Sequence, residues 1–374
     1  MSVTDNLAIA LGALLLVVVL YDVFQSIVLP RPAVGRVRLS VTFVRRVWRA
    51  WRFVATRPRR LRTREAGLAV FGPLIVVVLL VIWGFGVILA YALVYFGLRD
   101  QLHPQPATFG QTLYFSAGRM LAFSGGGIEP TGAAARVLTT FEAATGFGLF
   151  ALVISLLFSL FNAFQRREAA VVSLDVFAGA PPSGVQLLET CAKDNMADEL
   201  VQTFDDWRAW TADVIESHLA YPPLFYFRSS HDNEAWLNSF GAVMDASTLV
   251  LTTLEGGPVG HARLFHKIGM HFVQDVRVFT GLHLEAVPGV EREEFVEACG
   301  RLERAGLPLR DLDAAWEEFS VLRSKYGPWL NRITKNLAVP PAPWIGDRSY
   351  VPHRERGPVA RPVGGDQPKT RPAR

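Results

Sequence analysis

Apolar residues crowd into three long runs within the first 165 residues of the chain. The runs cover Leu7–Leu29, Ala66–Leu98 and Val137–Gln165. The first run contains a single charged residue, Asp22, the second contains none, and the third contains only Glu142. About 20 apolar residues at 1.5 Å each cross the hydrocarbon core of a bilayer. Each run therefore predicts a membrane-spanning helix, and the mean hydropathy of +0.24 agrees with a membrane protein.

The arginines of the chain are unevenly placed. Twelve arginines and no acidic residue lie between Arg31 and Arg64, which separates the first run from the second. Because basic loops remain in the cytoplasm, we expect the N-terminus outside, residues 30–65 inside, residues 99–136 outside and residues 166–374 inside. The first six residues contain no Lys or Arg, so the first run predicts a retained helix and not a signal peptide.

The basic loop predicts an amphipathic helix over Leu39–Ala55. Valine and tryptophan residues fall on one face of this helix and arginines fall on another. The apolar set is Val44, Val47, Trp48, Trp51 and Val54, and the basic set is Arg45, Arg49 and Arg52. Trp with Arg in this pattern is typical of a helix in the headgroup layer, so we expect anionic lipid headgroups as partners. Nucleic acid is the rival partner, and it is not expected because the segment is tethered between two spans.

Asp22 is an ionisable residue inside the first apolar run. Charged residues within spans are costly and are often functional. The alternatives are an ion pair with an arginine of the basic loop and a polar contact to a neighbouring helix. The sequence leaves these alternatives open.

The segment between the second and third runs has a pattern of its own. Thr108–Met120 predicts an amphipathic helix of about three turns, too short to cross a bilayer. The glycine-rich stretch Leu121–Gly127 follows it. A short helix followed by an extended glycine-rich segment between two spans is typical of an ion-selectivity filter, where backbone carbonyls replace the hydration shell of the ion. Glycine allows the positive φ angles that such a lining requires.

These residues resemble a known family. Thr112–Gly132 and Arg136–Ser155 are similar to the pore loop and inner helix of potassium channels. The most similar group is the bacterial ion-channel proteins with two membrane helices around one pore loop, often labelled with the two-pore-domain channels. Leu113–Ser116 resembles the pore helix of that family. Glu142 resembles the start of its inner helix, and Gly146 with Gly148 resembles its glycine hinge.

The resemblance covers about residues 67–165 and carries several expectations. One pore loop supplies a quarter of a filter, so it implies a homotetramer. It also implies passive transport of monovalent cations in the bacterial inner membrane, without a cofactor. Gly146 and Gly148 imply a helix that bends to gate the pore, with close packing of helices as the alternative.

The filter departs from the family pattern Thr-Val-Gly-Tyr-Gly-Asp. The corresponding residues here, aligned without gaps, are Ala122, Phe123, Ser124, Gly125, Gly126 and Gly127. A shift by one residue restores Gly-x-Gly, but neither alignment restores the threonine, the aromatic residue or the following acid. Three consecutive glycines predict a mobile lining and relaxed selectivity.

Two charged residues flank this filter. Glu129 from four subunits is expected to form an acidic ring at the outer mouth that favours cations, with a solvated loop acid as the alternative. Arg119 would oppose permeating cations unless an acid neutralises it. We therefore expect an ion pair of Arg119 with Glu129 or with Glu142.

The remaining sequence predicts an all-α cytoplasmic domain over residues 166–337. Helical patterns cover 184–220, 233–254, 259–284, 291–305 and 310–336, with a linker at 172–182. No G-x-G-x-x-G motif, P-loop or metal-ligand spacing is present, and Cys191 and Cys299 are expected as reduced thiols. Residues 338–374 have the composition of a disordered tail.

The expected fold is thus an all-α membrane protein in five parts. They are a transmembrane helix (1–30), a basic amphipathic linker (31–65), a pore module (66–165), the cytoplasmic helical domain (166–337) and the tail. The leading functional hypothesis is a pore-forming subunit of a potassium-channel-like cation channel with relaxed selectivity. The alternative is a non-conducting, channel-derived anchor or oligomeriser for a cytoplasmic sensor. No nucleophile–base pattern indicates an enzyme.

Overall fold

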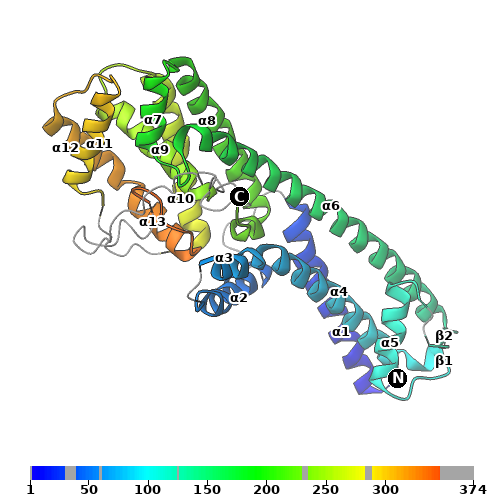
Figure 1. The fold of residues 1–374 in the computed structure, drawn as a ribbon. Helices are drawn as coiled ribbons and strands as arrows, with labels where there is room; N and C mark the ends of the chain where they lie inside the picture. The colour runs from blue at the N-terminus through cyan, green and yellow to red at the C-terminus, as the bar shows by residue number, and fades with distance from the viewer. Residues whose placement is uncertain are drawn as a thin grey trace, which may run out of the picture. The chain divides into compact units, whose positions relative to one another are not determined.

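The computed structural model describes residues 2–29, 39–58, 61–123, 126–229, 235–282 and 289–345 (Figure 1). Helices dominate these ranges, which confirms the all-α prediction. The chain forms two compact units. The first contains residues 1–172 and 209–232, and the second contains residues 173–208 and 233–374. Each unit is described separately below.

The described part has three helices that are long and apolar enough to cross a membrane. The first is α1 (Val3–Val23), which continues as the π-helical turn Phe24–Val28. The second is α4 (Phe71–Gly97), which follows the short helix α3 (Leu61–Ala69). The third is α6 (Ala133–Ala178). The three apolar runs in the sequence therefore form the three candidate membrane helices.

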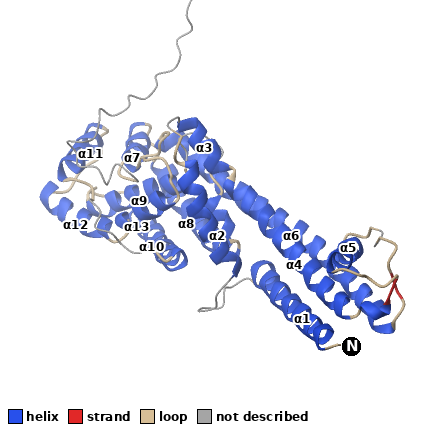
Figure 2. Cartoon of the chain, turned by 90° about the horizontal axis from the view of Figure 1, so that it is seen from below, coloured by secondary structure: helices blue, strands red, loops and turns tan. Residues whose placement is uncertain are grey.

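Small residues allow α1 and α4 to pack closely and antiparallel (Figures 1 and 2). A Cβ atom added to Gly12 would lie 2.6 Å from the carbonyl oxygen of Ala90. A Cβ atom on Gly97 would lie 2.5 Å from the carbonyl oxygen of Asp5. The Asp5 carboxylate also pairs with Arg99 at 3.1 Å, just beyond the end of α4. Close approach of backbones through Gly and Ala is a common way for helices to associate in membranes.

Helix α2 (Leu39–Ala55) covers the residues for which the sequence predicted an amphipathic helix. Its apolar face is buried at Val44 and Trp48, whereas Arg49 is exposed. The Trp48 ring lies 4.9 Å from the ring of Phe71, which is the first residue of α4. The Trp51 indole donates a hydrogen bond of 3.0 Å to the carbonyl oxygen of Gly67. Aromatic contacts therefore fix α2 against the beginning of the second candidate span.

The second unit is a helical domain around a central helix, α9 (Trp236–Thr252), in which nearly every residue is buried. Helices α7 (Gly184–Lys193), α10 (Val259–Thr280), α12 (Leu312–Ser324) and α13 (Gly327–Asn336) contact α9. Helix α11 (Arg292–Arg304) contacts α7 and α12. Helix α8 (Ala197–Ala220) begins in this unit and ends in the first.

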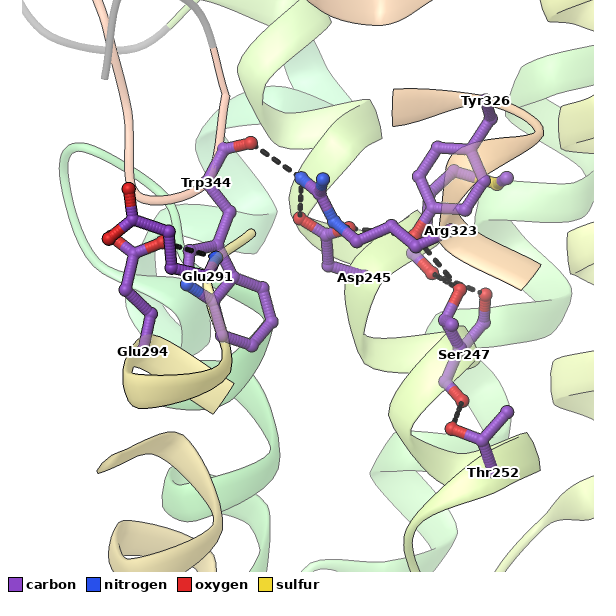
Figure 3. A network of polar contacts seen from close by, with 10 residues as sticks. Asp245, Ser247, Thr252, Glu291, Glu294, Arg323, Tyr326 and Trp344 are labelled. Atoms are coloured by element: carbon purple, nitrogen blue, oxygen red, sulfur yellow. Dashed lines mark hydrogen bonds and ion pairs between the residues drawn. The ribbon is translucent and has the colours of Figure 1, made fainter. Parts of the chain in front are cut away.

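A buried ion pair joins α9 to α12 inside the second unit (Figure 3). Arg323 donates to Asp245 at 2.9 Å and to the carbonyl oxygen of Trp344, and the Tyr326 hydroxyl donates to Asp245 at 2.7 Å. Burial raises the pKa of Asp245, while the charge of Arg323 and the hydrogen bonds from Arg323 and Tyr326 oppose that rise. Removing either partner would leave an uncompensated charge in the core of the second unit.

Two expected boundaries need correction. The linker expected from Val172 is helical as far as Ala178, because the first residue that breaks the helix is Gly179 with φ of 77°. The tail expected to be disordered from residue 338 packs into the second unit over its described part. Ala342 and Ile345 are fully buried there, because a few apolar residues can anchor a segment whose average composition is polar. The rest of the tail lies outside the described residues.

Candidate functional site

A short helix lies between the second and third candidate spans. Helix α5 (Phe109–Met120) begins with a capping box, in which the side chains of Thr108 and Gln111 satisfy backbone N–H groups. The strands β1 (Leu102–His103) and β2 (Glu129–Pro130) pair antiparallel and close the segment on itself. The segment between the end of α4 and the start of α6 therefore contains the helix α5 and is closed at its base by the β1–β2 pair.

A buried carboxylate on α6 holds α5 in place. Glu142 is fully buried. Its Oε2 atom accepts a 2.7 Å hydrogen bond from the hydroxyl of Tyr95 on α4, and its Oε1 atom lies 2.5 Å from the Ser116 hydroxyl on α5. The Ser116 hydroxyl also lies 2.9 Å from the carbonyl oxygen of Ile88. We call Tyr95, Ser116 and Glu142 the outer cluster. One side chain of α6 thus joins three helices of the first unit.

The backbone turns sharply after α5. Of the six expected filter residues, Ala122, Phe123, Gly126 and Gly127 are described, whereas Ser124 and Gly125 lie outside the described residues. Ala122, Gly126 and Gly127 have φ values of 58°, 69° and 76°. This left-handed conformation costs a non-glycine residue on the order of 1 kcal/mol, so Ala122 is held there by its surroundings. The Phe123 amide donates a 2.7 Å hydrogen bond to the carbonyl oxygen of Gly118.

Arg119 does not form the ion pair that the sequence led us to expect. Among the described residues neither Glu129 nor Glu142 lies within ion-pair distance of its guanidinium. Arg119 instead donates a 3.2 Å hydrogen bond to the carbonyl oxygen of Ile128 and lies 5.0 Å from the ring of Phe115. The reason is that hydroxyl groups already surround Glu142, while Glu129 is exposed in β2.

The two glycines of α6 have different environments. A Cβ atom on Gly146 would lie 2.6 Å from the carbonyl oxygen of Met120, the last residue of α5. A Cβ atom on Gly148 would meet nothing within 4 Å. Gly146 therefore permits close packing between α5 and α6, which was the alternative to a hinge, and Gly148 meets no such constraint from the residues that the structure describes.

Asp22 makes a polar contact to a neighbouring helix. Its Oδ2 atom accepts a 2.8 Å hydrogen bond from the Trp83 indole on α4. Its Oδ1 atom lies 3.4 Å from both the amide nitrogen and the hydroxyl of Ser40 on α2. Asp22 therefore links α1 to α4 and to the start of α2.

A second buried charge lies further along α6, at Arg167, and sequence analysis missed it. Arg167 is 1% exposed. It donates to the carbonyl oxygens of Leu224 (3.0 Å), inside the short helix η3 (Pro222–Tyr226), and of Phe227 (2.8 Å), just after it. It also donates to Glu168 Oε1 at 2.9 Å. We call Arg167, Glu168, His218 and the two carbonyl groups the inner cluster.

His218 completes the inner cluster as a neutral acceptor. Its Nε2 atom lies 3.3 Å from Arg167 Nη1, and its Nδ1 atom lies 2.9 Å from the carbonyl oxygen of Val214. Burial and the positive charge of Arg167 lower the pKa of His218 well below its usual value. Nδ1 therefore carries the proton and Nε2 accepts from Arg167. No signal in the sequence separates Arg167 from the exposed Arg166 beside it.

Comparison of the chain with models of protein families, with curated proteins and with solved structures gives no match in any of the three. Within the described ranges, no three His, Cys, Asp or Glu side chains gather where they could hold a metal ion.

Proposed function

We propose that this chain is the pore-forming subunit of a potassium-channel-like cation channel with relaxed selectivity. One observation carries the proposal: a short helix followed by left-handed backbone lies between two helices that can each span a membrane. Irregular backbone at membrane depth is tolerated where it lines a wet cavity or is buried in protein. The outer cluster and the β1–β2 pair hold this segment against α4 and α6.

The proposed topology places the N-terminus and residues 99–136 outside a bacterial inner membrane. The arginine-rich residues 31–65 and the second unit then lie in the cytoplasm, as the rule for basic loops requires. The exposed arginines of α2 face anionic lipid headgroups. Residues 66–165 form the pore module in this arrangement.

Four copies are needed because each chain contributes one filter segment. Glu129 is exposed after the filter, so four copies would place an acidic ring at the outer mouth and favour cations over anions. Gly126 and Gly127 lack side chains that could brace the filter, which supports weak discrimination among monovalent cations.

A second candidate is a non-conducting, channel-derived anchor for the second unit. Arg119 favours it, because its charge lies close to the filter and has no acidic partner among the described residues. A cation without a close ion pair at this position opposes the passage of cations. The two candidates differ in whether the protein conducts ions across a membrane.

Ion flux into liposomes distinguishes the channel from the non-conducting anchor. The purified chain is reconstituted, and potassium and sodium fluxes are compared with those of empty liposomes. Flux of both ions that falls in Glu129→Gln and persists in Asp100→Asn supports the channel, because both variants remove one exposed acid from residues 99–136. Flux of potassium alone contradicts relaxed selectivity. Absence of flux across voltage, pH and membrane tension supports the anchor.

A further inference from the structure

The segment that contains η3, residues 222–228, packs against the first turn of α4. A Cβ atom added to Gly72 would lie 2.7 Å from a ring carbon of Phe227 and 3.0 Å from the carbonyl oxygen of Tyr226. The ring of Tyr226 lies 5.3 Å from the ring of Phe71. Backbone atoms of the segment thus approach α4 so closely that any side chain at Gly72 displaces them. We call residues 222–228 the η3 segment.

The η3 segment also contacts α6. The ring of Phe227 lies 5.7 Å from the ring of Phe164. The carbonyl oxygens of Leu224 and Phe227 accept hydrogen bonds from Arg167. Phe227 therefore contacts α4 through its side chain and α6 through both its side chain and its carbonyl group.

Contacts with α2 and α3 hold the two ends of the η3 segment. The ring of Tyr226 lies 5.1 Å from Trp48 of α2. Arg228 donates hydrogen bonds of 2.9 and 2.5 Å to Glu65 of α3. Aromatic packing and an ion pair thus add to the contacts with α4 and α6, and the η3 segment joins four helices of the first unit.

Direct hydrogen bonds between α4 and α6 occur near the opposite end of α4. The Tyr95 hydroxyl donates to Glu142 at 2.7 Å, and the hydroxyl groups of Tyr91 and Thr145 lie 3.0 Å apart. These four residues are about five to six helical turns beyond Gly72 along α4 and its partner helix. The two helices are therefore bonded to each other near one end, and near the other end each contacts the η3 segment.

The chain reaches the η3 segment from the second unit and then returns to it. Residues 173–208 and 233–374 belong to the second unit, whereas residues 209–232 between them belong to the first. Helix α8 leads into the η3 segment, and α9 follows it. Both ends of the inserted stretch are therefore covalently continuous with the second unit.

We propose that the η3 segment transmits conformational changes of the second unit to α4 and α6. Packed side chains and hydrogen bonds carry energetic coupling between sites, and Phe227 supplies both kinds of contact. A displacement of the η3 segment then changes the spacing between Gly72 and Arg167. The inference rests on the proposed function for its consequence, the regulation of ion flux, but the coupling itself does not require conduction.

Hydrogen–deuterium exchange of the full chain in detergent micelles tests the coupling, with Gly72→Leu as the perturbation. Amide exchange should accelerate about tenfold in residues 222–228 and in residues 160–168 of α6. That factor corresponds to 1.4 kcal/mol, which is within the range for an overpacked contact. A segment that only fills space would respond locally, so acceleration in residues 222–228 without any change in α6 would overturn the coupling.

Gly84→Leu is the matched control. Gly84 lies on the same helix, but a Cβ atom there meets nothing within 4 Å among the described residues. The exchange of residues 160–168 should change less than about twofold in this variant, because no packed contact is disturbed. Equal acceleration by Gly72→Leu and Gly84→Leu would overturn the role of the η3 segment.

The same measurement tests the connection with the second unit. Coupling between two sites is reciprocal, so a perturbation at Gly72 should also reach residues 236–240 at the start of α9, with exchange about threefold faster. Unchanged exchange there, together with acceleration in α6, would overturn transmission from the second unit.

Phe227→Ala provides a second perturbation that adds no bulk, so it tests the proposal even where Gly72→Leu does not fold. It removes the ring that contacts Phe164 and should accelerate exchange in residues 160–168 about tenfold, as for a cavity at a packed contact. Phe150→Ala is its control, because Phe150 lies on α6 with a side chain that is 65% exposed. Equal acceleration by the two variants would contradict a specific role of Phe227.

The exchange and flux experiments fail separately. In a conducting chain, Gly72→Leu should change potassium flux about threefold or more and leave the ratio of potassium to sodium flux unaltered, because the filter segment is not touched. An exchange response without ion flux leaves this inference standing and contradicts the channel. Ion flux without an exchange response in α6 contradicts this inference alone.

Discussion

The outer and inner clusters both bury an ionisable side chain of α6, but they use different kinds of partner. Glu142 is held by hydroxyl groups from α4 and α5, which are side chains that single substitutions can remove. Arg167 is held by Glu168 and His218 and also by backbone carbonyls at Leu224 and Phe227, which no side-chain substitution removes. Substitutions can therefore remove the hydrogen bonds of the outer cluster one at a time, whereas loss of Arg167 leaves buried carbonyls without a donor.

The largest effect is expected at the inner cluster. Arg167→Ala leaves Glu168 and two carbonyl groups without their donor in a buried site, so the free energy of unfolding should fall by about 3–5 kcal/mol. Thermal unfolding of the full chain in detergent micelles measures this loss. Arg166→Ala is the neighbouring control, because its pair with Asp213 is exposed and should contribute less than about 1 kcal/mol. Equal losses of unfolding free energy in the two variants would show that the buried contacts of Arg167 stabilise the chain no more than the exposed pair of Arg166.

The outer cluster should lose stability in two steps. Glu142→Ala leaves the buried Tyr95 hydroxyl without its acceptor and removes one partner of Ser116, which should cost about 2–3 kcal/mol. Tyr95→Phe removes a single hydrogen bond and keeps the ring contact with Phe115 at 4.9 Å, so the expected cost is about 1 kcal/mol. The same unfolding measurement ranks the two variants. A larger loss in Tyr95→Phe than in Glu142→Ala would contradict the assignment of Glu142 as the shared acceptor.

Gly146 and Gly148 should respond in opposite directions. Gly146→Ala forces a methyl group against the carbonyl oxygen of Met120 and should destabilise the chain by about 1–3 kcal/mol. Gly148→Ala meets no atom within 4 Å and removes a flexible residue from a helix, so it should stabilise by up to about 1 kcal/mol. Unfolding midpoints of the two variants, measured side by side, test this prediction. Equal destabilisation by both would indicate that another copy of the chain approaches Gly148.

Acid should weaken the inner cluster. His218 has a lowered pKa in the folded chain, so below the ordinary histidine pKa of about 6.5 the unfolded chain binds a proton that the folded chain does not. Stability is therefore complete above that pKa and is lost as the pH falls below it. The loss should reach about 1.4 kcal/mol between about pH 7.5 and about pH 5.5.

His218→Gln provides the comparison for this pH dependence, because its amide oxygen can accept from Arg167 but does not titrate. The variant should lose less stability than the unaltered chain over the same interval, as measured by unfolding at each pH. An identical pH profile for the two chains would exclude His218 as the source of the acid effect.

Regular apolar and amphipathic patterns in the sequence predicted the helices well. The three apolar runs became α1, α4 and α6, and the Trp and Val spacing predicted α2 over the residues that form it. Thr108 and the glycines after Met120 bracket α5 in the same way. These features are local, so the sequence of a segment contains most of the information.

Contacts between distant segments were not predictable. The partner of Arg119 depends on the position of the Ile128 carbonyl beside α5. The nearer of the two expected acids, Glu142, is hydrogen-bonded to Tyr95 and Ser116 instead. In the sequence Arg167 resembles an ordinary positive residue that follows a long apolar run, and its burial depends on a segment more than fifty residues later. Ile345 shows the same limitation in the second unit, since it packs against Gly241 of α9, about a hundred residues earlier in the chain.

The spacing of the two clusters has a mechanical consequence. Glu142 and Arg167 are fixed at points 25 residues apart on one uninterrupted helix, which at 1.5 Å per residue is a lever of about 37 Å. A pivot of about 5° at Glu142 would carry Arg167 sideways by about 3 Å, which is the length of a hydrogen bond. Arg167 would then lose its two carbonyl partners. The hydrogen bonds of Arg167 are therefore sensitive to a tilt of α6 much smaller than the rotation needed to displace a whole helix.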